Sequence, residues 1–181
     1  DACVLYPAPL RDLLMRLAVL DLFQARWTDR IHAEWTRNVL ANSADISPTS
    51  LTRCRQLMNA HVRDCLVTGY EHHISNLRLP DADDRHVLAA AIHAGAGLIV
   101  TFNLRDFPVS ALGPHDVVAI HPDSFVVGLW EEFPESVLKA VRLQRAGLKI
   151  PAKSAAEYLA TLEKCRLPET VACLRPHSAE I

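Results

Sequence analysis

The stretch LPDADDRHVLAAAIHAGAGLIVTFNLRDFP, residues 79–108, decides the fold of this protein. Pro80 and three aspartates precede an alanine-rich run, which predicts a helix up to about residue 94. A Gly-Ala-Gly turn ends that helix, and the β-branched residues of LIVT at 98–101 predict a short buried strand. Helix, turn and strand in this order indicate an α/β fold with a parallel sheet.

The rest of the chain extends this pattern on both sides. The apolar run CVLY at 3–6 predicts the end of a buried strand, and VVAI at 117–120 predicts another strand. Everything after Pro122 has helical spacing, so we expect a domain over 1–121 and a helical appendage over 122–181. The predicted helices are 10–23, 28–40 with Thr28 or Asp29 as its cap, 48–66 with Ser47 as its cap, 81–94, 122–132, 135–146, 154–165 and 168–174.

Composition limits the class of protein. Half of the 181 residues are hydrophobic and 22% are charged, which is typical of a soluble globular protein. No apolar run approaches the roughly 18 residues of a membrane span, so we expect no membrane partner. Five scattered cysteines indicate reduced thiols, most of them small buried hydrophobic residues, in a cytoplasmic protein.

Charge is divided unevenly along the chain. Residues 1–135 carry 11 Arg against 17 Asp and Glu, whereas residues 136–181 carry 8 Lys and Arg against 4 Glu. Lys139, Arg142 and Arg145 recur every three residues in the basic segment. This run fits contact with RNA, with the acidic first segment or with a protein partner, and the sequence leaves that choice open.

Asp84 is the first candidate for a functional acid. On the predicted helix it shares a face with Val87, Leu88 and Ala91, which places its carboxylate at the rim of the core. Asp81 or Asp83 can cap the helix, and Asp83 is the favoured cap. The alternative is that all three aspartates serve only to cap the helix and to favour its dipole.

Other polar residues are expected near the same rim. Asp1 lies at a predicted strand, Glu34 lies beside the apolar stripe of its helix, and Asn103 and Asp106 follow the strand at 98–101. Ligands of open parallel sheets bind at the carboxyl ends of the strands. Because clustered carboxylates repel each other, such a site needs a cation, and oxygen donors select Mg²⁺ or Mn²⁺. That chemistry suits phosphodiester hydrolysis.

Three separated motifs together resemble the PIN domains, over about residues 1–125. They are DACVLY at 1–6, HAEWTRNV at 32–39 and DDRHVLAAAIHAGAGLIVTFNLRDFP at 83–108, and they are most similar to VapC-type toxins of bacterial toxin–antitoxin pairs. The segment after residue 122 resembles the C-terminal extension of one VapC subgroup. The resemblance implies an α/β/α sandwich with a mainly parallel central sheet. It also implies an Mg²⁺- or Mn²⁺-dependent endoribonuclease that cleaves tRNA or rRNA, forms a homodimer and is inhibited by a cognate antitoxin.

The resemblance also assigns roles to residues. Asp1, Glu34, Asp84 and Asp106 match the catalytic acids of the family. Asp1, Asp84 and Asp106 are the implied metal ligands, with Asn103 as a neutral alternative, because many family members have an acid where this chain has Asn103. Thr101 is expected to position a metal-bound water or a phosphate.

Basic residues near these motifs are candidates for RNA contact. Arg11, Arg85 and Arg105 are expected to reach phosphate, although a solvent-facing ion pair is favoured for Arg85. Helical geometry turns His86 about 160° away from Asp84, so we expect His86 to be structural or exposed. Two other functions fit the sequence: a PIN-type nuclease of RNA processing, and a non-catalytic protein-binding module.

Overall fold

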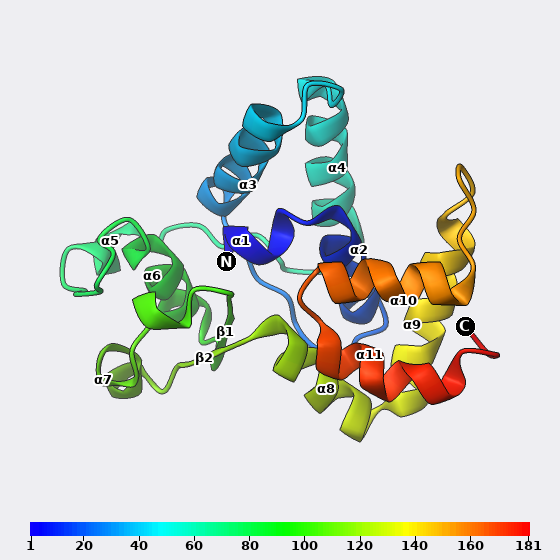
Figure 1. The fold of residues 1–181 in the computed structure, drawn as a ribbon. Helices are drawn as coiled ribbons and strands as arrows, with labels where there is room; N and C mark the ends of the chain where they lie inside the picture. Colours follow the sequence, from blue (N-terminus) through cyan, green and yellow to red (C-terminus); the bar gives the residue numbers. More distant parts are fainter. The chain divides into compact units, whose positions relative to one another are not determined.

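The computed structural model describes residues 1–181, and the chain forms two compact units (Figure 1). The first unit comprises Asp1–Tyr6 and Gln24–His121, and the second comprises Pro7–Phe23 and Pro122–Ile181. The change of unit after His121 coincides with the expected domain boundary. The segment 7–23 differs from expectation, because it belongs to the second unit.

The first unit is mixed α/β and mostly helical. Its sheet consists of the two short strands β1 and β2, and its remaining elements are α-helices and 3₁₀ turns. In chain order they are α1 (Ala2–Leu5), α3 (Asp29–Asn42), α4 (Pro48–His61), α5 (Glu71–Ile74), α6 (Arg85–Ala94), β1 (Leu98–Val100), η1 (Leu104–Asp106), α7 (Val109–Leu112), η2 (Gly113–His115) and β2 (Val118–Ile120).

The sheet forms where the sequence predicts it. β1 and β2 pair in parallel, with Ile99 opposite Ala119, and α6 packs against β1. Ile99 is buried, but Leu98 and Val118 are 47% and 57% exposed. β1 is therefore buried only at its centre and β2 is at most half-buried, whereas the sequence predicts a buried strand at 98–101.

The prediction of a strand at 3–6 is wrong. Ala2–Leu5 is the short helix α1, with Asp1 at its N-cap position, and it packs against α3. Val4 and Leu5 are buried in that contact. Four consecutive apolar residues fit a buried helix as well as a buried strand, so periodicity does not separate the two.

Helix α3 follows the predicted pattern. The hydroxyl of Thr28 accepts the N–H of Ile31 at 3.1 Å and so caps the helix. Ile31, Trp35 and Val39 are buried along one face, as predicted. A buried chain of hydrogen bonds runs from the Trp35 indole to Nδ1 of His32, and from Nε2 of His32 to Asn59 of α4.

Helix α4 begins as predicted, since Ser47 accepts the N–H of Ser50 and Pro48 is the first helical residue. It ends at His61 rather than near Leu66. The following residues extend alongside Trp27, whose N–H donates to the Cys65 carbonyl while its own carbonyl accepts the N–H of Val67, both at 2.8 Å. These backbone hydrogen bonds replace the last turn of the predicted helix.

The second unit is entirely helical. The fully buried residues Leu10, Leu13 and Leu17 form the apolar stripe of α2, which packs against α9 and α10. This packing explains why segment 7–23 belongs to the second unit. Helix formation after Pro122 is confirmed. The elements are α2 (Ala8–Val19), α8 (Pro122–Glu132), α9 (Pro134–Gly147), α10 (Ala155–Lys164), α11 (Pro168–Leu174) and η3 (Arg175–His177).

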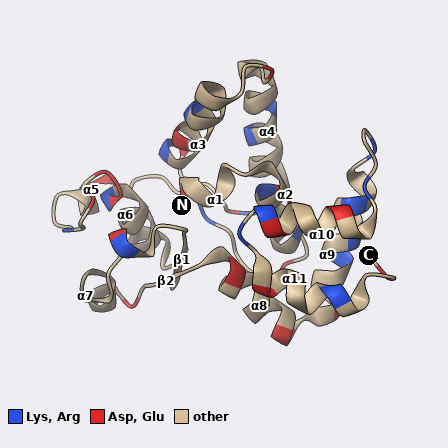
Figure 2. Cartoon of the chain, in the orientation of Figure 1, with Lys and Arg blue, Asp and Glu red and all other residues tan.

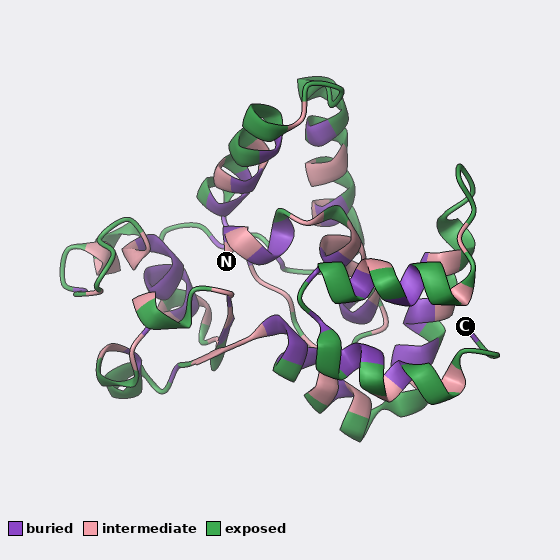
Figure 3. Ribbon diagram, in the orientation of Figure 1, coloured by how far each residue is buried: buried purple, intermediate pink, exposed green.

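Buried polar side chains connect the helices of the second unit. Asp123 is 3% exposed, and its carboxylate accepts the backbone N–H groups of Glu169 and Thr170 and the Thr170 hydroxyl, at 2.7–2.8 Å. Tyr158 donates to Gln144 at 2.7 Å. Purple segments in Figure 3 mark such buried positions. None of the helices combines the length and apolar character that a membrane crossing requires.

Candidate active site

Asp84 is at the N-cap of α6, but its side chain makes no capping hydrogen bond. The helix begins at Arg85 and not at residue 81. The preceding turn is held by Asp81, whose carboxylate accepts the N–H of Asp83 at 2.8 Å. The prediction that Asp83 caps the helix is therefore wrong. The Asp84 carboxylate, half-buried at the start of a helix, is left for another role.

The electrostatic environment of Asp84 shows which acids surround it. Burial raises its pKa to about 6, and the negative charges of Asp81, Asp106 and Glu34 add to that rise. The nearby amino group of Asp1 acts in the opposite direction. Glu34 of α3 and Asp106 of η1 therefore both lie within electrostatic range of Asp84 at the start of α6.

Glu34 is held by two basic side chains. Its Oε1 atom lies 2.9 Å from Nε2 of His86 and 3.2 Å from Nε of Arg30. Burial raises the pKa of Glu34, but the hydrogen bonds and charges of His86 and Arg30 together outweigh it, so the pKa is lowered. Arg30 also donates to the carbonyl of Asp83 and so ties α3 to the turn before α6.

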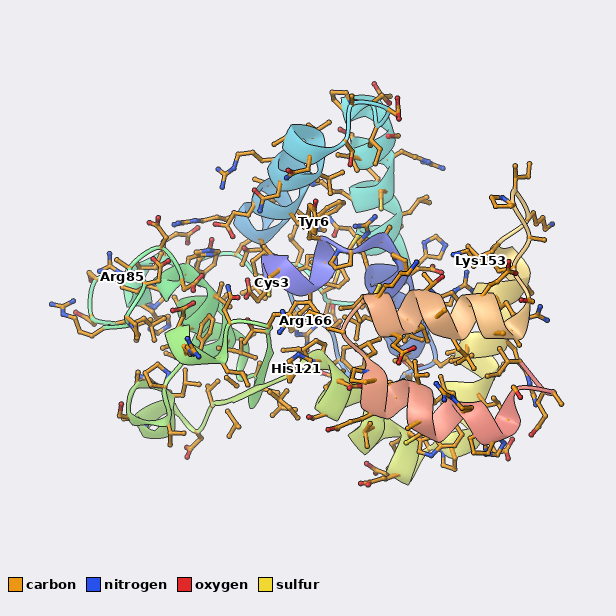
Figure 4. The ribbon with its side chains drawn as sticks, viewed as in Figure 1. Cys3, Tyr6, Arg85, His121, Lys153 and Arg166 are labelled. Atoms are coloured by element: carbon orange, nitrogen blue, oxygen red, sulfur yellow. The ribbon has the colours of Figure 1, made fainter.

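Asp1 is anchored at the carboxyl end of β1. Its Oδ2 atom accepts the hydroxyl of Thr101 at 2.6 Å and the thiol of Cys3 at 3.0 Å. Thr101 is fully buried, and its hydroxyl oxygen also accepts the N–H of Asn103. Thr101 therefore orients Asp1 directly. Figure 4 labels Cys3 on α1 and Arg85 at the start of α6.

Asp106 and Asn103 differ in their surroundings. Both belong to the turn that follows β1, where the Asp106 N–H donates to the Asn103 carbonyl at 2.9 Å. Asp106 is half-buried and acts electrostatically on Asp84, whereas Asn103 is exposed. The structure thus relates Asp106 to Asp84 through its charge, whereas the neutral Asn103 is tied to Asp1 through the Thr101 hydroxyl that its N–H contacts.

Three residues at the site were not predicted for it. His86 of α6 is 1% exposed and contacts Glu34, which lies on α3. The position of His86 relative to Asp84 on α6 does not reveal a contact with another helix. Arg30 had a signal in the sequence, since it precedes Glu34 by four residues. Cys3 is half-buried and accepts the N–H of Phe102, so it is more than a small hydrophobic residue. All five cysteines are free thiols.

The predicted RNA-contacting arginines belong to different elements of the chain. Arg105 is exposed on η1, and Arg85 donates to the Ala82 carbonyl instead of forming the favoured ion pair. Arg11 lies on α2 in the second unit. Figure 2 marks the basic residues of α9 and the loop after it, where Arg142 pairs with Glu180 at 2.6 Å and Arg145 donates to the Lys153 carbonyl.

In the comparison with known proteins, the match to a family model falls on the C-terminal helices. Residues 122–176 match the family model described as the VapC50 C-terminal domain. Over 58 residues the chain is 48% identical to the "Putative ribonuclease VapC50" of Mycobacterium tuberculosis (strain ATCC 25618 / H37Rv). These matches support a VapC-type family. The VapC50 alignment covers 30% of this chain and 34% of that relative, so it spans about a third of the relative's length. No solved structure matches the chain.

Proposed function

We propose that this protein is a metal-dependent endoribonuclease, the toxin of a VapC-type toxin–antitoxin pair, with a PIN-like α/β/α catalytic domain and a helical extension. The observation that carries the proposal is the gathering of Glu34 and Asp106 around Asp84, whose pKa they help to raise to about 6. The VapC-type match supports the same function from a different part of the chain.

The acidic residues fit a hard divalent ion. Burial raises the pKa of Asp84 most and the negative charges of neighbouring carboxylates raise it further, so a cation among them would relieve repulsion. We propose Asp1, Asp84 and Asp106 as ligands of Mg²⁺ or Mn²⁺, with Asn103 as the neutral alternative to Asp106. When bound, such an ion lowers the pKa of a coordinated water and stabilises charge on a departing oxygen.

Neighbouring side chains hold Asp1 as a ligand and keep Glu34 charged beside the proposed ion. Thr101 and Cys3 both contact Oδ2 of Asp1, so its second carboxylate oxygen stays available for a cation. Arg30 and His86 both contact Oε1 of Glu34, and its lowered pKa keeps it ionised at neutral pH. Ionised Glu34 adds negative charge near Asp84 and so favours a cation there.

The proposal includes the partners of the protein. RNA is the proposed substrate, with Arg105 as the exposed phosphate contact and Arg85 and Arg11 as further candidates. A cognate antitoxin, a homodimeric state and a cytoplasmic location belong to the same proposal. The alternatives remain an RNA-processing nuclease and a non-catalytic protein-binding module.

The test of catalysis compares two neighbouring aspartates. The purified full chain is incubated with labelled tRNA and rRNA in Mn²⁺, with EDTA added to a parallel sample. We expect Asp84→Asn to lower the cleavage rate at least about 100-fold, whereas Asp83→Asn, which removes the same charge one position away, retains activity. Cleavage that persists in EDTA or in Asp84→Asn contradicts the metal-dependent mechanism.

A second experiment separates a toxin from a processing enzyme. The full chain is expressed in a bacterial host with and without the product of a small neighbouring gene. Growth arrest that this product relieves supports the toxin. Normal growth, together with cleavage in the first assay, supports RNA processing, and the absence of cleavage favours the binding module.

A further inference from the structure

Three histidines of the first unit come together away from the carboxylates. His72 and His73 lie on α5, and His93 lies in the last turn of α6. One ring nitrogen from each lies within 4.8 Å of the others. The ring centroids of His72 and His73 are 4.0 Å apart, and each is 5.7–5.8 Å from the His93 ring. The packing of α5 on α6 therefore brings two distant sequence segments to one point.

A backbone carbonyl orients the first of these rings. Nδ1 of His72 lies 2.7 Å from the carbonyl oxygen of Gly69, so Nδ1 donates a proton there and Nε2 is left with its lone pair. Gly69 has φ +78°, a left-handed conformation that glycine adopts without strain. Metal-binding histidines almost always have such a second hydrogen bond, because it fixes the tautomer and the ring orientation.

Neutral imidazole is the form that binds a metal ion, so metal binding at this cluster competes with protonation of the rings.

We propose that His72, His73 and His93 form a binding site for a divalent transition metal ion such as Zn²⁺, Co²⁺ or Ni²⁺, chemically distinct from the carboxylate cluster. Imidazole nitrogens suit these ions, whereas Mg²⁺ prefers oxygen donors. Three ligands leave one tetrahedral position for water, and His72 and His93 are exposed to solvent. With Zn–N bonds of about 2.05 Å, ligand nitrogens lie about 3.3 Å apart, so the rings close by about 1.5 Å at most.

A metal ion at this site would stabilise the fold of the first unit. A bound ion would join α5 to the last turn of α6, the helix that has Asp84 at its N-cap. Because such an ion binds the folded chain and not a preformed site in the unfolded chain, it stabilises the folded state. The proposal does not depend on nuclease activity, since it concerns nitrogen ligands outside the carboxylate cluster.

Zn²⁺ binding by isothermal titration calorimetry tests the site. The full chain is used without an affinity tag and with Asp84→Asn and Asp106→Asn, which remove carboxylates that would also attract cations. We expect one Zn²⁺ per chain and a higher melting temperature with Zn²⁺. His72→Gln and His93→Gln should each weaken binding at least about tenfold, while His61→Gln, a control on α4, should leave the affinity unchanged.

Circular dichroism confirms that each variant is folded before titration. Co²⁺ absorption in the visible range reports the coordination and supplies a second readout. Equal Zn²⁺ affinity of His72→Gln, His93→Gln and the parent chain overturns the proposal, and so does the absence of Zn²⁺ binding to the parent.

Discussion

Asp123 of the second unit and Asp84 of the first are both withdrawn from solvent, yet their surroundings differ in kind. Asp123 accepts three hydrogen bonds from the first turn of α11, so its charge is compensated where it lies. Asp84 has no capping hydrogen bond and stands among other carboxylates that raise its pKa. A buried acid whose charge is satisfied by hydrogen bonds serves the fold, whereas an acid held among like charges is a candidate for binding or catalysis.

The largest expected effect is on stability, and it tests the structural role of Asp123. Asp123→Ala leaves two N–H groups of α11 and one hydroxyl without their acceptor, so we expect the free energy of unfolding to fall by about 3 kcal/mol. Urea denaturation followed by circular dichroism measures it. Glu132→Ala, at an exposed position of α8, is the control and should change stability by less than about 0.5 kcal/mol. Equal effects of the two substitutions would contradict the structural role of Asp123.

Asp84→Asn should raise the free energy of unfolding, whereas Asp123→Ala lowers it. Since the pKa of Asp84 is raised to about 6 in the folded chain, its ionisation costs stability as pH rises from about 4 to about 6. We expect the variant to stabilise the metal-free protein by about 1–2 kcal/mol at pH 7, allowing for solvent screening. The gain should shrink as pH falls from about 6 and disappear below about pH 3, where Asp84 is protonated in both states.

Thermal unfolding in EDTA across this pH range measures the Asp84→Asn effect, with Asp83→Asn as the control. A variant less stable than the parent at pH 7 would show that Asp84 is satisfied in the way Asp123 is. The same raised pKa predicts that Mn²⁺ affinity falls as pH drops through about 6, because protons compete for the carboxylate.

Thr101→Val tests how Asp1 is oriented. Valine keeps the shape of the buried side chain but removes the hydroxyl that donates to Oδ2 of Asp1. We expect the Mn²⁺ affinity to fall about tenfold, the cost of losing an interaction that orients a ligand. Calorimetric titration with Mn²⁺ measures it, and Thr36→Val, at a half-buried position of α3 where the hydroxyl donates to the His32 carbonyl, is the control. An unchanged affinity would exclude Asp1 as a ligand held by Thr101.

Arg30→Gln should have the smallest effect. Its ion pair with Glu34 is partly exposed, so we expect a loss of about 0.5 kcal/mol in stability that diminishes at high salt. Denaturation at low and high ionic strength measures this change. A loss that does not respond to salt would assign the effect to the hydrogen bond between Arg30 and the Asp83 carbonyl instead.

Much of the local structure could be predicted, because its signals lie within short segments. Thr28 and Ser47 cap the helices they were expected to cap, and both strands form at their β-branched runs. The errors arise where distant residues decide. The end of α4 depends on backbone pairing with Trp27, and the placement of segment 7–23 depends on its packing against α9.

The candidate site shows the same limit. The acidic residues of the candidate site could be named from the sequence, because a carboxylate beside an apolar stripe is an unusual pattern. The partners of those acids could not, since His86 reaches Glu34 across two helices and Cys3 and Thr101 meet at Asp1 from segments about 100 residues apart. A helical wheel describes the faces of one helix and does not predict its contacts with other helices.

Helix α6 connects the two candidate sites. It has ten residues, so about 15 Å separates the ends of its axis, with Asp84 at the first turn and His93 at the last. Residues 86–91 between them are all buried. A displacement of either end would require the whole helix to repack, so the spacing of two bound ions would be set by a rigid backbone and could be measured as a distance between paramagnetic metals.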